Sequence, residues 1–293
     1  MRYEHHQVSA EEMYFFDLRG YLVVPGILGS DEIDAVNRAL DAKMSDAVTL
    51  EAGSLSGGAE NLTGDSGRTQ ITGMLGWEPE HRAPFRRLLV HPVVVSRLNA
   101  FTGRGFRLDH GPLLISGRKG AEGHRLHGSG EPFGQSVTYH QQNGRIYCRG
   151  VTVAWQLADC GPGDGGFAIV PGSHKTREPT PDDVRTLNDD MGLVEQPVMR
   201  AGDVLFFAET ATHGTLPWQA DHERRSVLYK YAARGAARAV GKYFTPEDRL
   251  GDWTKELTPE QQAVLYGPGV HHGGRLTFLD SDGEKAWVVN TGT

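Results

Sequence analysis

The sequence predicts a mainly β protein with helical decoration, an α+β fold in which N-terminal helices precede a double-stranded β-helix, the cupin-like jelly roll. Three observations carry this prediction. Short strand-like runs follow one another between Phe106 and Tyr231, turns rich in glycine and proline separate them, and no helical crossover of the kind that joins parallel strands lies between them. A β core of this kind uses 293 residues as one unit, so we expect a single domain over residues 1–293.

The N-terminal part, residues 1–105, is expected to be mainly helical. Ser9 followed by two glutamates is typical of a capped helix start, and Gly20 is typical of a helix end. Ser30 is expected to cap a second helix, in which apolar residues recur on one face. Residues 47–80 are rich in glycine, serine and threonine with little periodicity, which predicts a lid-like loop. The predicted helices cover residues 10–19, 31–44, 83–89 and 95–98, and a short strand covers 21–24.

The jelly-roll core is expected over residues 106–240, and a C-terminal cover over 241–293. Within the cover, Thr258-Pro259-Glu260-Gln261 combines a capping box with proline at the first helical position, which predicts a short helix. The tail after Gly267 is expected to form an edge strand or a further part of the cover. The predicted core strands cover residues 106–108, 112–116, 151–157, 166–170, 203–207 and 226–231.

Charge and composition exclude several classes of function. A formal net charge of −7 argues against a groove for a nucleic-acid polymer, which requires a basic field. No apolar run approaches the roughly 18 residues that span a bilayer, and the first residues do not resemble a secretory signal. Two cysteines, Cys148 and Cys160, are too few for a disulfide scaffold. We therefore expect a cytoplasmic protein that acts on small molecules, as a monomer or a homodimer.

Histidine spacing points to a metal site. Non-haem iron on a jelly roll is held by two histidines and one carboxylate on one face of the metal. Here His213 follows the predicted strand at 203–207, and Arg224 lies eleven residues beyond it at the start of the next strand. A guanidinium grips a carboxylate through two parallel hydrogen bonds, which suits an organic-acid co-substrate. The pair predicts the second histidine ligand and the anchor of a 2-oxo acid.

The first histidine ligand has two candidates. His127 begins the run His127-Gly128-Ser129, and His140 lies in Tyr139-His140-Gln141-Gln142. In an iron site of this kind the carboxylate follows the first histidine by two residues, so that both side chains of an extended segment point the same way. Neither candidate has an acidic residue there, so the predicted site lacks its carboxylate.

At this point the sequence resembles the phytanoyl-CoA dioxygenase family of Fe(II)/2-oxoglutarate enzymes. The resemblance runs from Phe15-Phe16-Asp17-Leu18-Arg19-Gly20-Tyr21 to the region after Arg224. Its more specific parts are Trp155-Gln156-Leu157-Ala158-Asp159, the run from Gly165 through Pro171-Gly172-Ser173-His174-Lys175, and His213 with Arg224.

The resemblance implies a double-stranded β-helix that uses Fe(II), 2-oxoglutarate and O2. It implies that 2-oxoglutarate is bound by Arg224 with help from Thr215, Ser116 and Trp155. It also favours His127 as the first ligand, which makes Tyr139 and His140 part of the substrate-pocket wall, although His140 stays an alternative ligand.

The missing carboxylate departs from the family pattern. With Gly128 and Ser129 after His127, there is room for a halide on the iron, and this absence resembles the non-haem iron halogenases. Glu131 as an unusual ligand, the Gln142 amide or a water molecule are the alternatives. Chloride is therefore an expected fourth component beside iron, 2-oxoglutarate and O2.

The sequence thus predicts an Fe(II)/2-oxoglutarate-dependent oxidoreductase, with chlorination of an aliphatic C–H bond favoured over hydroxylation. A pseudo-enzyme that binds 2-oxoglutarate without turnover is the non-catalytic alternative, because loss of a metal ligand also inactivates such sites. Basic residues close to the iron motif, among them Arg118 and Arg125, predict a mouth that attracts an anionic or nucleotide-like biosynthetic molecule.

Overall fold

The structure is a computed structural model that describes residues 8–128, 130, 137–236, 244–270 and 276–291. Its α-helices are α1 (Ala10–Arg19), α2 (Ser30–Lys43), α3 (Pro79–Leu89), α4 (Pro92–Thr102), α5 (Asp182–Thr186), α6 (Pro246–Leu250) and α7 (Pro259–Ala263). Short 3-10 helices are η1 (Met44–Asp46), η2 (Glu60–Leu62), η3 (Met74–Gly76), η4 (Ser173–Lys175) and η5 (Asp252–Glu256).

The strands are β1 (Tyr21–Val24), β2 (Val48–Thr49), β3 (Thr69–Ile71), β4 (Arg107–Gly117), β5 (His124–His127), β6 (Tyr139–Gln142), β7 (Arg145–Cys148), β8 (Gly150–Gln156), β9 (Gly166–Ile169), β10 (Val204–Ala208), β11 (His213–Leu216), β12 (Arg224–Ala232), β13 (Leu276–Ser281) and β14 (Ala286–Thr291).

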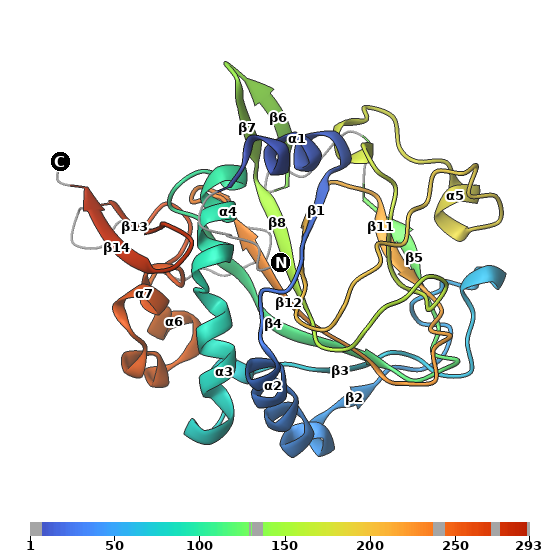
Figure 1. The fold of residues 1–293 in the computed structure, drawn as a ribbon, viewed down its shortest axis with the longest axis horizontal. Coiled ribbons are helices and arrows are strands. Elements are labelled where there is room, and N and C mark those ends of the chain that lie inside the picture. Colours follow the sequence, from blue (N-terminus) through green and yellow to red (C-terminus); the bar gives the residue numbers. More distant parts are fainter. Residues whose placement is uncertain (1–7, 129, 131–136, 237–243, 271–275, 292–293) are drawn as a thin grey trace.

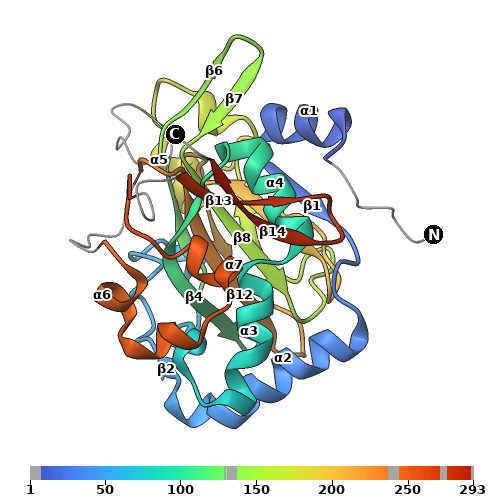
Figure 2. The same ribbon diagram turned by 90° about the vertical axis from the view of Figure 1, so that its left-hand side faces the viewer.

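Two antiparallel sheets form the core. The larger has the order β1-β10-β8-β12-β4-β3-β2, and the smaller has the order β5-β11-β9. Figure 1 shows α3 and α4 on one side of the large sheet and β5 and β11 on the other, and in Figure 2 these helices lie in front of β8, β12 and β4. The large sheet is therefore covered by helices on its outer face, and the two sheets enclose a barrel interior between them, as predicted for a jelly roll.

Local chemistry explains the predicted N-terminal elements. The Ser9 hydroxyl accepts a hydrogen bond from the Glu12 N–H, and the Glu12 carboxylate accepts one from the Ser9 N–H, which closes a capping box at α1. Gly20 ends α1 at φ +78°, and a Cβ there would lie 2.4 Å from Nδ1 of His174, so only glycine is compatible.

Two expectations are corrected here. Ser30 is the first residue of α2 rather than its cap: the cap is Gly29, because the preceding turn is held by bonds from Ile27 and Leu28 to the carbonyl of Gly202. Residues 47–80 are not a detached lid, because β3 pairs with β4 and β2 pairs with β3, which extends the large sheet.

The C-terminal cover packs on the helical side of the molecule. The predicted capping box at Thr258 opens α7, as expected. β13 and β14 pair only with each other, and buried residues of this region such as Leu265 and Leu279 join the main hydrophobic core. Within the part of the chain that the structure describes, every helix is too short or too polar to cross a membrane. Cys148 and Cys160 are buried and carry free thiols.

Candidate active site in the barrel

The smaller sheet brings His127 and His213 together. β5 and β11 are antiparallel neighbours, and His213 is the direct register partner of His127. Their ring centroids lie 4.5 Å apart, and the ring of His124 lies 4.5 Å from that of His127. The pairing register between β5 and β11 shifts between His213 and Thr215 of β11. Irregularities of this kind are often found beside active sites. Residues 86 positions apart in sequence thus meet on adjacent strands.

Both rings are oriented by backbone carbonyls. Nδ1 of His213 lies 2.8 Å from the carbonyl oxygen of Ala211, and Nδ1 of His127 lies 3.1 Å from that of Arg125. Because a carbonyl only accepts, each Nδ1 carries the proton, and Nε2 becomes the nitrogen that would face a metal. Metal-binding histidines usually have this second hydrogen bond, which fixes the tautomer and the ring orientation.

The environment keeps the imidazoles of His213 and His124 neutral. Burial, with added repulsion from His127, lowers the pKa of His213 well below its ordinary value. Burial, again followed by repulsion from His127, lowers the pKa of His124 to about 4. Neutral imidazole is the form that binds metals, so the site has donor chemistry suited to a divalent transition metal at neutral pH.

These histidines open into a cavity of about 150 Å³ inside the barrel. Alternate residues of the strands line it, since every second side chain of a strand points to the same face. Three cations, Arg68, Arg224 and Lys230, lie in its wall. Among the residues that the structure describes, no aspartate or glutamate belongs to the lining. The other lining residues are Leu113, Ile115, His124, His127, Ala154, Gln156, Phe167, Met199, Leu205, Phe207, His213, Gly214, Thr215, Ser226 and Leu228.

Arg224 has the features of an anion anchor. It begins β12, and no carboxylate or hydrogen-bond acceptor from the described residues engages its guanidinium. Burial lowers the pKa of Arg224 to about 10, so the side chain stays charged at neutral pH. Gly166 lies beside it: a Cβ there would be in ordinary contact with Nε of Arg224, at 3.5 Å. A half-buried cation without a partner among the described residues is costly, and a bound carboxylate would remove that cost.

Arg68 and Lys230 are functional candidates that the sequence reasoning missed. Arg68 comes from the segment before β3 and donates to the Gln70 side chain at 3.2 Å, while its Nε is buried without a described acceptor. Lys230 lies 3.3 Å from the Glu209 carboxylate. Burial lowers the pKa of both side chains, and for Lys230 repulsion from Arg68 adds to this. The cavity is therefore built for negatively charged ligands.

The carboxylate position of the iron motif carries no acid. Gly128, which lies between His127 and the carboxylate position, adopts φ +107°, and a Cβ on it would lie 2.3 Å from the carbonyl oxygen of Ala211, so Gly128 itself can only be glycine. Ser129 and Glu131 lie outside the described residues. Among the residues that are described, no group of three or more His, Cys, Asp or Glu side chains is arranged to hold a metal ion. His127 and His213 are the two histidines that the strand register sets opposite each other in the described part of the chain.

Thr215 lies in the cavity wall as expected, whereas Ser116 and Trp155 do not. On β8, Ala154 and Gln156 face the cavity, so Trp155 points to the opposite face and packs in the main core, 5.3 Å from the His91 ring. On β4 the inward residues are Leu113 and Ile115. Ser116 points outward and donates to the Glu223 carboxylate. The alternation of the strands removes both from direct contact with a ligand in this cavity.

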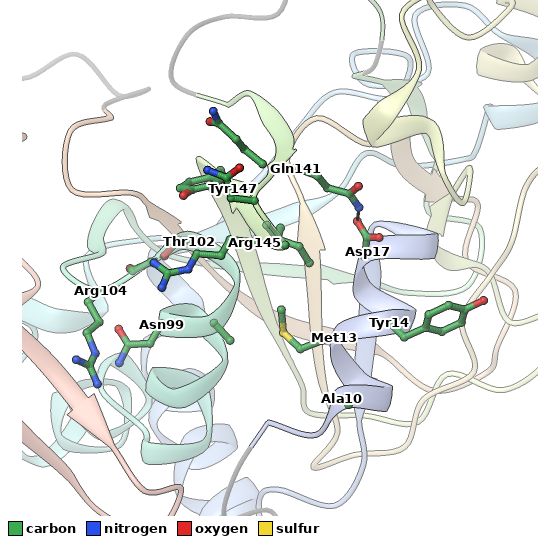
Figure 3. A pocket seen from close by; sticks show the side chains of 16 residues that line it. Ala10, Met13, Tyr14, Asp17, Asn99, Thr102, Arg104, Gln141, Arg145 and Tyr147 are labelled. Atoms are coloured by element: carbon green, nitrogen blue, oxygen red, sulfur yellow. Dashed lines mark hydrogen bonds between the residues drawn. The ribbon is translucent and has the colours of Figure 1, made fainter.

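Tyr139 and His140 lie on the β6–β7 hairpin, outside the barrel cavity. The Tyr139 hydroxyl donates to Asp17, and the exposed His140 ring stacks on Tyr147 with 4.8 Å between centroids. This hairpin borders a cavity of about 940 Å³ between α1, α4 and β6–β7. Figure 3 shows Gln141 reaching across it to Asp17 of α1. Gln142, the other alternative ligand, lines the same groove and not the barrel.

The expected basic mouth is also displaced from the barrel cavity. Arg125 points away from its neighbours on β5 and forms an ion pair with Asp182 of α5. Arg118 is exposed and borders a separate surface depression beside Ser116 and Glu223. The cations that line the barrel cavity lie instead in the segment before β3 and on β12.

Comparisons with known proteins identify the family and the fold. The family model for phytanoyl-CoA dioxygenase matches residues 16–226, well over half of the chain. No curated protein sequence matches. Among solved structures, the fold is similar to HygX from Streptomyces hygroscopicus with nickel and 2-oxoglutarate bound, at 21% identity and a TM-score of 0.64, covering 77% of this chain and 87% of HygX.

Two further structures share the fold. The epimerase SnoN in complex with Fe3+, alpha ketoglutarate and nogalamycin RO is 18% identical, with a TM-score of 0.57 and coverage of 90% of this chain and 95% of SnoN. AviO1 from Streptomyces viridochromogenes Tue57 is 19% identical, with a TM-score of 0.56 and coverage of 79% and 97%. With a family match over this length, and with paired histidines and an arginine in a jelly-roll cavity, the chain belongs to the phytanoyl-CoA dioxygenase family.

Proposed function

We propose that this protein is an Fe(II)/2-oxoglutarate-dependent enzyme that functionalises a C–H bond of a small biosynthetic molecule, with chlorination as its leading reaction. The observation that carries the proposal is one cavity in which two carbonyl-oriented histidines stand beside an arginine; among the described residues this arginine has no partner and the wall has no acid. HygX with nickel and 2-oxoglutarate bound, and SnoN in complex with Fe3+ and alpha ketoglutarate, support the metal and the co-substrate.

The residues present suit this metal and co-substrate. His127 and His213 would hold the iron through Nε2, and Arg224 would bind the distal carboxylate of 2-oxoglutarate with Thr215 beside it. Bound iron supplies O2 activation, in which 2-oxoglutarate is converted to succinate and CO2. The Nδ1 bonds to Ala211 and Arg125 keep both rings in one tautomer and orientation, so that they need not reorganise when the metal binds.

The side chains around the histidines would also exclude water and hold charged ligands in place. Phe207 packs against His213 with 4.6 Å between ring centroids, and Phe167 lies on the same ring at 6.2 Å. Such apolar walls lower the local dielectric and strengthen the pull of Arg224 and Arg68 on an anion. A cavity of about 150 Å³ in proteins holds a molecule the size of benzene. Bound 2-oxoglutarate would therefore fill the barrel cavity.

Chloride is proposed as the anion that completes the iron's ligand set. The reaction would consume the substrate C–H, chloride, a proton, O2 and 2-oxoglutarate, and yield the C–Cl product, succinate, CO2 and water. Two features support this version: the sequence has serine at the carboxylate position, and Arg68, Arg224 and Lys230 give the cavity a positive field that favours a halide. Hydroxylation is the alternative if water or Glu131 occupies that position.

Chloride linkage tests this proposal without knowledge of the substrate. We expect chloride to tighten 2-oxoglutarate binding to the iron-loaded protein under anaerobic conditions, because two ligands of one metal site are thermodynamically coupled. Ser129→Asp should abolish the chloride effect while 2-oxoglutarate still binds, and Ser129→Ala should retain it.

The readout is calorimetry with and without chloride, followed by succinate release in air. Equal chloride dependence in wild type and Ser129→Asp would refute halide binding at this position. Tight 2-oxoglutarate binding with no succinate under any condition would instead identify a non-catalytic binding protein.

A further inference from the structure

A second cavity adjoins the barrel cavity at the edge of the large sheet. β3 pairs with β4 only at Leu114, Ile115 and Ser116, so β4 from Arg107 to Leu113 has no strand on that side. A cavity of about 310 Å³ lies there, which we call the edge chamber. Three residues, Leu113, Leu228 and Lys230, line both the edge chamber and the barrel cavity.

A bulge in β4 forms the mouth of the edge chamber. Leu228 pairs with Leu113 and Lys230 pairs with His110, so Gly111 and Pro112 stand opposite the single residue Tyr229. Such a bulge bends the strand and ends regular pairing, and proline supplies no N–H for it. The bulge thus opens the wall of the barrel at the shared residues.

The C-terminal cover forms the opposite wall. The Arg249 guanidinium of α6 donates to the carbonyls of Leu108 and Asp109, at 2.6 Å for Leu108, which ties α6 to β4. Trp253 is held in place because the glycine at position 76 leaves room for its ring and the Arg86 guanidinium lies 5.0 Å from the ring centroid. A rigid indole and α6 therefore face β4 across the chamber.

The lining defines the chemistry of an occupant. Apolar side chains predominate, including Leu75, Leu250 and Trp253, and the lining also has the basic residues His110, Lys230 and Arg249. No aspartate or glutamate is among the described lining residues, while Lys230 pairs with Glu209 and His110 lies 2.9 Å from the Asp109 carboxylate. Its volume is in the range of pockets for organic ligands, whereas the barrel cavity is smaller than that range.

We propose that the edge chamber binds the main substrate, and that this substrate has an apolar aliphatic or aromatic body and is neutral or anionic rather than cationic. The role of the edge chamber as a substrate site rests on the proposed function. The shared residues Leu113, Leu228 and Lys230 place the substrate at the border of the metal-facing cavity, and Lys230 is the positive charge at that border.

Two positions allow the chamber to be filled without disturbing the fold. A Cβ on Gly111 meets no atom within 4 Å, and its backbone is not in the left-handed region. Thr72, which directly follows β3 and also lines the chamber, is exposed and makes no side-chain hydrogen bond to described residues. Gly111→Phe and Thr72→Phe would each place a ring in the chamber. Gly111→Ala replaces the same glycine and adds almost no volume.

The experiment measures fluorescence of 1-anilinonaphthalene-8-sulfonate, an apolar aromatic anion, with the full chain loaded with Ni(II) and 2-oxoglutarate. We expect the wild type to bind one molecule per chain, both phenylalanine variants to bind at least about tenfold more weakly, and Gly111→Ala to bind as the wild type does. Dansylcadaverine, an aromatic cation of similar size, should bind at least about tenfold more weakly than the anion.

Unchanged binding in both phenylalanine variants would overturn the proposal, as would equal loss in Gly111→Ala or equal affinity for the cation. Cooperative unfolding of each variant is checked by circular dichroism. Binding of Ni(II) and 2-oxoglutarate is measured separately in the same samples. If the wild type binds neither Ni(II) nor 2-oxoglutarate, the proposed function is refuted. If both ligands bind but the chamber variants bind the probe as the wild type does, only this inference is refuted.

Discussion

The groove beside the β6–β7 hairpin and the cavity inside the barrel differ in size and in chemistry. The groove between α1, α4 and the β6–β7 hairpin has about 940 Å³, and the barrel cavity has about 150 Å³. In the groove the carboxylate of Asp17 is already engaged by Tyr139 and Gln141, and no histidine lines it. In the barrel, three histidines and three cations converge without an acid. The chemistry of the lining, rather than the volume, identifies the active site.

The difference follows from how each wall is built. In the barrel, strand pairing sets His213 opposite His127 and strand alternation aims Ser226, Leu228 and Lys230 at the same space. The groove is bordered by helix surfaces and the tip of a hairpin, where Asn143 and Gly144 both have positive φ as a two-residue turn requires. Sheet pairing gives the positional precision that metal chemistry needs.

Removal of a histidine ligand should have the largest effect. We expect His127→Ala and His213→Ala to weaken Fe(II) binding by more than about a hundredfold, since even outer partners of metal ligands affect affinity by tenfold or more. His140→Ala, in the groove region, should bind Fe(II) as the wild type does. Anaerobic equilibrium dialysis measures this. Loss of binding in His140→Ala with retention in His127→Ala would transfer the first ligand to the hairpin.

Removal of the anion anchor, Arg224, should have the second-largest effect. Arg224→Gln is expected to weaken 2-oxoglutarate binding by roughly ten- to a hundredfold, because a bidentate charge-assisted pair is lost. Fe(II) binding should be preserved. Arg145→Gln in the groove is the matched control and should leave 2-oxoglutarate affinity unchanged. Equal losses in both variants would mean that the barrel arginine is not the specific anchor.

The histidine of the groove region should affect stability rather than chemistry. His174 is fully buried, its Nε2 lies 3.0 Å from the Asp17 carbonyl oxygen, and burial lowers its pKa to about 4. The unfolded chain, with a pKa near 6.5, binds more protons between these values, so stability is fully present above pH 6.5 and is lost as pH falls towards 4. The loss at pH 5 is about 2 kcal/mol.

Urea unfolding at pH 8 and pH 5 measures this contribution. His174→Gln should unfold with a smaller difference between the two pH values than the wild type, whereas the exposed His140→Gln should keep the wild-type difference. An unchanged difference in His174→Gln would show that this ring does not stay neutral in the folded protein.

Substitutions on the open face of the groove should have the smallest effect. Tyr14 is 62% exposed on α1 and borders the groove far from the histidine pair in the fold. We expect Tyr14→Ala to change Fe(II) and 2-oxoglutarate affinity by less than about twofold, as is usual for surface positions. A larger change would link the groove to the barrel site and weaken the contrast between them.

Much of this organisation follows from local sequence signals. The capping box at Ser9 and the strands that became β8, β10 and β12 could be predicted from residue type and turn chemistry. The pair His213 and Arg224 could be predicted from spacing, because each residue begins one of two strands, β11 and β12, that follow each other in the chain. These features depend on neighbours in the chain, which the sequence displays directly.

Other features depend on tertiary pairing. Every residue of β8 is buried, so no alternation of polarity tells that Gln156 faces the cavity and Trp155 faces the helices. Arg68 reaches the cavity only because β3 pairs with β4, and its glycine-rich surroundings predicted a loop. Tyr139 was expected in the pocket wall, yet the β6–β7 hairpin carries it to Asp17.

The most direct test of the barrel site is an anaerobic crystal structure with Fe(II), 2-oxoglutarate and chloride. The expected result is iron bound by Nε2 of His127 and His213, with a carboxylate of 2-oxoglutarate on Arg224 and a chloride ion on the iron beside Ser129. Iron bound at His140 or in the outer groove, or 2-oxoglutarate bound away from Arg224, would contradict the account.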